Sequence, residues 1–228
     1  VGDASRPRGI ESLDKRPRLG GTDRHAGGRR SGNAGLATYF SECFGIDEEL
    51  LEKHGAFNVS LVTDLPLFID PFLLFNSARL EYQALHRGII EYLVFLRDKA
   101  KGGPIEPALL KAWYCFPEIK QTWLGFSQTD NRGSGLGMDF ARALHGSLGD
   151  IFSDFGAERV TQSSHLEKVC LIRPGVGRDN ISDFAANLIK DHLCRYTQAF
   201  AQAHLRPEQT KLVAVRGAAF NHGTETWE

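Results

Sequence analysis

The pattern that most constrains the fold is the run of apolar residues between Ile181 and His204. Its large apolar side chains recur mostly at intervals of three or four residues: Ile181, Phe184, Leu188, Leu193, Tyr196 and Phe200. Such a stripe is typical of an amphipathic helix that packs one face on a core. We therefore predict one continuous helix over residues 181–204, with Phe184, Leu188 and Leu193 buried.

Further helices and a few short strands are predicted around this helix. Glycine stops, acidic first turns and helical spacing predict helices over 36–45, 46–55, 72–101, 105–116 and 136–156. Alternating or continuous short apolar runs predict strands near 57–62, 66–70, 167–173 and 211–216. The fold class expected is α/β or α+β, helix-rich with a small mixed sheet, in which 167–216 forms a right-handed strand–helix–strand crossover.

Residues 1–35 differ in composition from the rest of the chain. They hold eight glycines, eight Lys or Arg and four Asp or Glu, with few large apolar residues. Such a segment cannot bury enough apolar surface to offset its ordering entropy, so we predict a disordered basic arm or linker. Residues 36–228 are expected to form a single globular domain that is truncated at its C-terminus.

Composition narrows the class of protein. The net charge of −1 argues against a general DNA-coating protein, because such a protein normally has a strongly positive net charge. The sequence has no apolar run of membrane-spanning length and no secretory leader pattern, which predicts a protein without a membrane partner. Its four cysteines are widely spaced, without a zinc pattern, and are interpreted as reduced core residues of a cytoplasmic protein.

Two stretches suggest a metal site. Asp70 ends the apolar run "DLPLFID", where an isolated charge is costly. Asp179 and Asp183 follow the loop "RPGVGRDN", and carboxylates with substrate phosphate are typical ligands of Mg²⁺. We expect these three aspartates to bind Mg²⁺, with phosphate held by four residues of the loop: Arg173, Gly175, Gly177 and Arg178. The alternative is that each acid caps a helix, with Pro71 at the first position after Asp70.

The reaction implied by such a site is phosphodiester hydrolysis. Glu167, in "HLEKV", is the candidate general base, and nucleic acid or another phosphodiester is the expected substrate of a Mg²⁺-dependent, nuclease-like hydrolase. The alternative function is a non-catalytic interaction or regulatory module. Its contact surface would be the aromatic segment 113–126, although such residues also fill cores.

Two resemblances extend this interpretation. The segment "GSGLG" resembles the last glycine box of GHKL-type ATPases, which would imply ATP binding, but the other motifs of that family are missing. The segments "GVGRDNISDFAANLIKDHLCRYTQAFA" and "FNHGTETW" resemble an uncharacterised bacterial protein family with no assigned activity. That resemblance implies a bacterial origin and supplies no catalytic residues.

Overall fold

The computed structural model describes residues 38–63, 65–119, 135–151 and 178–228. The chain divides into two units, Val1–Gly35 and Leu36–Glu228, and the described residues all belong to the second. The predicted disordered arm therefore lies outside the described residues. In the described part of the chain, eight α-helices and one small sheet form the fold, so the helix-rich prediction is confirmed.

The first two helices end at the predicted glycines. Helix α1 spans Phe40–Phe44 and α2 spans Glu48–His54. Gly45 and Gly55 follow them with φ of 65° and 81°, the left-handed conformation that glycine adopts without a Cβ penalty. The Asp47 carboxylate accepts a hydrogen bond of 3.0 Å from the Glu49 amide and caps α2.

The predicted helix over 72–101 is interrupted. Helix α3 spans Pro71–Phe75 and α4 spans Leu80–Lys101. At the break, the Asn76 side-chain amide donates to the Phe72 carbonyl, and the Ser77 hydroxyl accepts from the Arg79 amide. The Phe72 carbonyl also accepts from the Asn76 backbone amide, so the group freed by the break is the Arg79 amide, which the Ser77 hydroxyl satisfies.

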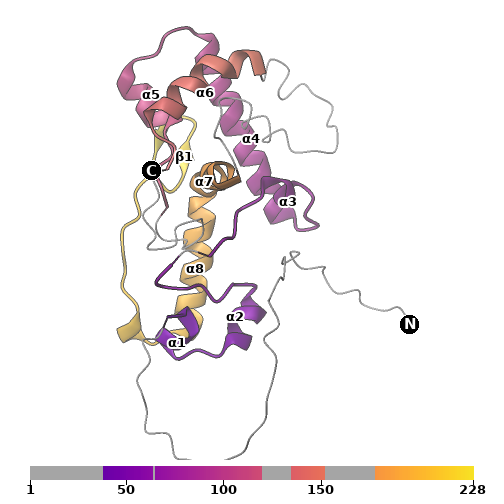
Figure 1. Ribbon diagram of the computed structural model, residues 1–228, viewed down its shortest axis with the longest axis vertical. Helices are drawn as coiled ribbons and strands as arrows, with labels where there is room; N and C mark the ends of the chain where they lie inside the picture. Colours follow the sequence, from indigo (N-terminus) through magenta and orange to yellow (C-terminus); the bar gives the residue numbers. More distant parts are fainter. Residues whose placement is uncertain (1–37, 64, 120–134, 152–177) are drawn as a thin grey trace, which may run out of the picture. The chain divides into compact units, whose positions relative to one another are not determined.

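The core lies between α4, α5 (Pro107–Tyr114), α6 (Met138–Ile151) and α7 (Arg178–Leu188). Figure 1 shows α4, α5 and α6 side by side. Two buried tyrosines tie α4 to α5: the Tyr92 hydroxyl donates to the Trp113 carbonyl at 2.7 Å, and the Tyr114 hydroxyl donates to the Leu96 carbonyl at 2.5 Å. Burial raises the pKa of both hydroxyls, which keeps them protonated as donors.

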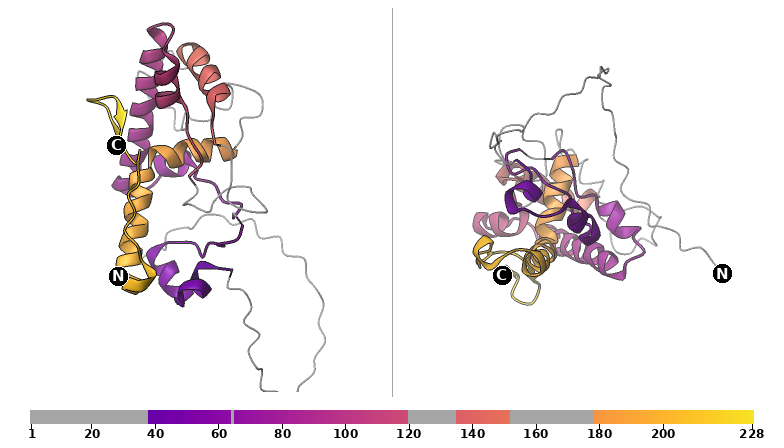
Figure 2. Two further views of the ribbon diagram at one scale, coloured as in Figure 1. Left: turned by 90° about the vertical axis from the view of Figure 1, so that its left-hand side faces the viewer. Right: turned by 90° about the horizontal axis from the view of Figure 1, so that it is seen from below.

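The prediction of one continuous helix over 181–204 is wrong. Helix α7 ends at Leu188, and α8 spans Lys190–His204 in a different direction, as Figure 2 shows. Phe184 is fully buried in the main core, whereas Leu188 and Leu193 are only partly buried. The two halves pack on different partners, since Tyr196 of α8 donates to the His54 carbonyl at the end of α2.

The sheet is smaller than expected and lies elsewhere. Strands β1 (Phe220–Asn221) and β2 (Thr226–Trp227) form an antiparallel hairpin, with Phe220 opposite Trp227. Residues 57–62, 66–70 and 211–216 form no strand, apart from an isolated bridge between Tyr39 and Ser60, so these three predictions are wrong. The fourth predicted strand, 167–173, lies outside the described residues. None of the helices described is long and apolar enough to cross a membrane.

Candidate functional site

Asp70 has the capping role that was the alternative to metal binding. Its carboxylate accepts a hydrogen bond of 2.9 Å from the Phe72 amide, and Pro71 occupies the first position of α3. The side chain is exposed, so its charge is solvated and needs no metal for compensation. The carboxylate at the end of the apolar run is therefore explained by helix initiation.

The segment before Asp70 nevertheless contacts the start of α7. The amide of Ile69 donates a hydrogen bond of 2.9 Å to the hydroxyl of Ser182, which is buried. Ser182 precedes Asp183, so the two segments predicted to share a metal are neighbours. The structure thus brings together the backbone segments, although the Asp70 carboxylate is engaged by its own helix.

The remaining predicted site residues are only partly described. Asp179 is exposed in the first turn of α7, where a negative charge interacts favourably with the helix dipole. The Asp183 carbonyl accepts from the buried side chain of Asn187, which also donates to the Pro117 carbonyl.

Four predicted residues lie outside the described residues: Glu167, Arg173, Gly175 and Gly177. Arg178 begins α7, and its side chain is likewise not described. No group of three potential metal-ligating side chains gathers within the described ranges.

The aromatic segment is core where it is described. Trp113, Tyr114 and Phe116 are buried. The Phe116 and Phe184 rings pack edge to face, with their centres 4.6 Å apart. These three side chains fill the core and do not form a contact surface in this structure. Trp123 and Phe126, in the rest of the segment, lie outside the described residues.

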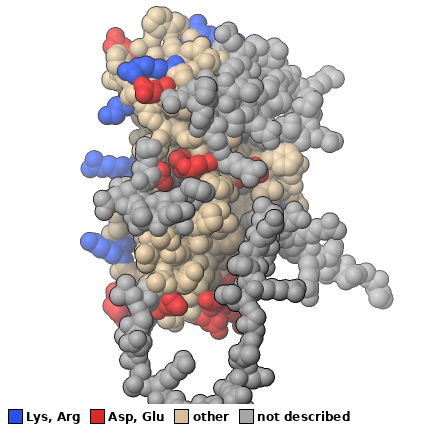
Figure 3. Space-filling view, in the orientation of Figure 1, with Lys and Arg blue, Asp and Glu red and all other residues tan. Residues whose placement is uncertain are grey.

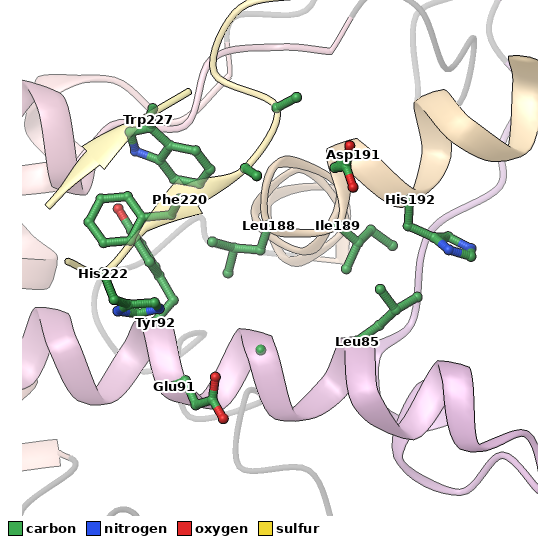
Figure 4. Close-up of a pocket in the computed structure, with 13 residues that line it drawn as sticks. Leu85, Glu91, Tyr92, Leu188, Ile189, Asp191, His192, Phe220, His222 and Trp227 are labelled. Carbon is green, nitrogen blue, oxygen red and sulfur yellow. The ribbon is translucent and has the colours of Figure 1, made fainter. Parts of the chain in front are cut away.

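A surface groove lies between α4, the α7–α8 junction and the C-terminal hairpin, and it was not predicted (Figure 4). It has a volume of about 300 Å³. Tyr92, Phe220 and Trp227 lie on one side, Leu188 of the junction faces them, and Ile189 points toward Leu85. The break between α7 and α8 therefore supplies one wall of the groove.

Gly88 lies in the α4 side of this groove. A Cβ added at Gly88 would meet nothing within 4 Å, so the packing of the described chain does not require a glycine there. Glycine inside a helix costs about 0.5–1 kcal/mol relative to alanine. A glycine that exposes the helix backbone at the floor of a groove permits close approach of a ligand.

The polar lining of the groove is acidic and histidine-containing. Glu91 is exposed and forms no ion pair or hydrogen bond with the described part of the chain. Asp191 accepts a hydrogen bond of 2.8 Å from Arg195 Nε, which raises the pKa of Arg195. His192 Nδ1 lies 3.4 Å from a carboxylate oxygen of Glu81. Among the described residues that line the groove there is no lysine or arginine.

The hairpin wall of the groove is fixed by contacts on its other side. Lys99 Nζ lies 2.8 Å from the Glu225 carboxylate and 5.1 Å from the centre of the Trp113 ring. The indole of Trp113 donates to the Glu225 carbonyl, and that of Trp227 donates to the Ala112 carbonyl. Because α4 and α5 both hold the hairpin, the aromatic wall is formed before any ligand binds.

The sequence carried only weak signals for this groove. Its residues come from three separated segments of the chain. The one local signal is Gly88, a glycine inside a segment whose other residues follow a helical pattern. The ending "FNHGTETW" forms the hairpin, whose turn is shaped by the Asn221 side chain accepting from the Gly223 and Thr224 amides. No motif indicated that these segments would meet.

Comparison with known proteins identifies the family. Residues 45–228 match the family described as "Domain of unknown function (DUF8370)". The match extends well beyond the C-terminal half, and it confirms the expectation of a family without an assigned activity. No curated protein and no solved structure matches the chain. The chain belongs to the DUF8370 family.

Proposed function

We propose that this domain is a non-catalytic binding module whose groove takes an arginine side chain of a partner protein. The observation that carries the proposal is the described lining of the groove, which combines aromatic walls with two carboxylates and includes no described lysine or arginine. The volume of about 300 Å³ is at the small end of ligand sites, which suits one long side chain.

Arginine fits the two kinds of surface that the groove offers. A guanidinium group stacks on aromatic rings and pairs with carboxylates, and its stem packs on apolar surface. Phe220 and Trp227, which are both partly exposed, offer the rings, and Leu85 and Leu188 offer aliphatic surface (Figure 4). Glu91, which no described residue neutralises, offers the charge. Asp191 contributes less, because Arg195 already pairs with it.

A nuclear magnetic resonance titration with N-acetyl-arginine amide tests the proposal. We expect the amide signals of Gly88, Ala218 and Ala219, which line the groove, to shift in a saturable way. Gly88→Leu should fill the floor and weaken binding by about tenfold, equivalent to about 1.4 kcal/mol. Glu91→Gln should weaken it as well, and N-acetyl-citrulline amide, which has a similar shape without the charge, should bind more weakly than the arginine compound.

Gly88→Ala and Glu52→Gln are the matched controls for this titration. Gly88→Ala adds only a methyl group, and its Cβ meets nothing, so it should keep most of the binding and stabilise α4 by about 0.5–1 kcal/mol. Glu52→Gln removes an exposed charge on α2 and should leave binding unchanged. The proposal is contradicted if the amide signals of the groove residues do not shift, or if they still shift in the Gly88→Leu variant.

A Mg²⁺-dependent phosphodiester hydrolase is the second candidate function. The observation that favours it is the hydrogen bond between Ile69 and Ser182, which holds the Asp70 segment beside α7. In this candidate, Asp70, Asp179 and Asp183 bind Mg²⁺, Arg173 and Arg178 contact phosphate together with Gly175 and Gly177, and Glu167 is the base.

Thermal melts with and without millimolar Mg²⁺ or Mn²⁺ test this candidate. A site that binds the ion only in the folded state should raise the melting temperature. When the ion concentration is a hundred times Kd, binding should add about 2.7 kcal/mol to the free energy of unfolding. The rise should disappear in Asp179→Asn and Asp183→Asn, whereas Asp139→Asn, on the exposed first turn of α6, should retain it. A wild-type protein without any rise would remove the hydrolase from consideration.

A further inference from the structure

The segment between the short helix η2 (Pro207–Gln209) and β1 is extended and exposed. Its sequence, "KLVAV" over 211–215, is rich in residues that favour strands. Leu212, Val213 and Val215 are 94%, 66% and 37% exposed. Figure 1 shows the segment as a long connection that leads to β1. An exposed apolar segment of this kind is typical of a surface that a partner covers.

The backbone of this segment is unpaired within the described chain. No amide or carbonyl of residues 211–215 takes part in a backbone hydrogen bond with a described residue. Unpaired extended backbone next to apolar side chains is the usual template for addition of a strand from another chain. The segment therefore offers both the hydrogen bonds and the apolar contacts that strand addition uses.

Both ends of the segment are fixed. At one end, the Gln209 side chain donates to the Phe44 carbonyl at 3.0 Å. At the other, Lys190 Nζ donates to the Arg216 carbonyl at 2.9 Å, and the Asp191 amide donates to the Ala218 carbonyl at 3.0 Å. Because the chain is held in an extended form before binding, a partner strand has less conformational entropy to remove.

The charges of the segment select its partner. Lys211 and Arg216 flank an uncharged interior, and the space-filling view shows basic side chains along the side on which this segment runs (Figure 3). In a second copy of the chain paired antiparallel about residues 213 and 214, Lys211 would lie opposite Arg216, and directly opposed like charges are destabilising. A strand with acidic ends places opposite charges at both positions.

We propose that residues 211–215 pair, by backbone hydrogen bonds, with an extended apolar segment with acidic ends from a partner protein. Residues 211–215 do not line the groove, so this proposal can be tested independently of arginine binding. The bound pair would cover the exposed side chains of Leu212, Val213 and Val215.

Hydrogen exchange on the full chain tests the proposal. The probe is the peptide acetyl-Glu-Val-Thr-Val-Thr-Val-Glu-amide, and its control has lysine in place of both glutamates. The acidic-ended peptide should slow exchange of the alternate amides of 211–215 that point toward it by about tenfold or more near saturation, and the basic-ended peptide should have little effect. Val213→Pro removes one backbone donor from an exposed position, so it should abolish this protection while leaving the melting temperature unchanged.

Each other result overturns the proposal in a recognisable way. Protection of 211–215 in the free protein at every concentration would mean that the segment is already paired within its own chain. Protection that grows with protein concentration alone would mean that a second copy is the partner. Equal protection by the two peptides would mean that Lys211 and Arg216 do not select the partner, and no protection by either would mean that the segment does not accept a strand.

Discussion

Replacing Gly135 by alanine is expected to lower the free energy of unfolding by about 3 kcal/mol or more, because a strained φ and a backbone clash add together. Gly135 has φ of +58°. A Cβ added there would lie 2.5 Å from the Glu118 nitrogen and 2.8 Å from the Phe116 oxygen. Both of these atoms belong to backbone that cannot rotate out of the way. Urea denaturation followed by circular dichroism measures the loss.

Gly137→Ala is the matched control, two residues further along the same glycine-containing segment. Gly137 does not have a left-handed φ, and a Cβ there meets nothing within 4 Å. Its substitution should change stability by about 0.5 kcal/mol or less. Equal losses in the two variants would contradict the argument, since local helix propensity rather than close approach would then account for both.

The conformation of Gly135 bears on the resemblance of "GSGLG" to an ATP-binding glycine box. Leu136 and Phe116 form an antiparallel bridge, with hydrogen bonds of 2.7 and 2.9 Å between their backbones. This bridge brings the two chain segments so close that only glycine fits beside it. Contact between the protein's own segments is therefore sufficient to explain Gly135, without a bound phosphate.

Elements whose ends are set by neighbouring residues could be predicted from the sequence. Helices α1 and α2 stop at Gly45 and Gly55, and the Asp47 cap starts α2 as the acidic pattern indicated. The helical spacing that predicted a helix over 72–101 is correct over α4, where Ile89, Tyr92 and Leu96 are buried. In each case the information lies within one or two helical turns, which is the range over which capping and amphipathic spacing act.

Features set by distant partners could not be predicted. The apolar stripe of 181–204 continues across Ile189, but its two halves pack on different elements, and periodicity alone cannot report a change of partner. The segment 211–216 has the composition of a strand, yet a strand requires a neighbour, and none lies beside it among the described residues. Asp70 differs from these two cases, because its helix cap depends on adjacent residues and was one of the two roles that the sequence offered for it.

The candidate groove illustrates the same limit. Tyr92, Leu188 and Trp227 are far apart in the sequence, and each was interpreted, where it was interpreted at all, as part of a helix or a tail. Their meeting depends on the α7–α8 break and on the hairpin anchored by Lys99 and Glu225. A site formed by tertiary packing carries no fixed residue spacing, so motif searching has nothing to detect.

Phe184→Ala is expected to destabilise the fold by about 3–5 kcal/mol, the usual cost of removing a fully buried aromatic ring. The Phe184 side chain has no exposed surface, and its ring meets that of Phe116 at 4.6 Å. Phe57→Ala is the control, because Phe57 is 47% exposed and its loss should cost less than about 1 kcal/mol. Leu188→Ala should fall between them, since Leu188 is partly buried at the groove. If Phe184→Ala cost no more than Phe57→Ala, α7 would not be docked in the core, and the groove wall that depends on it would not exist.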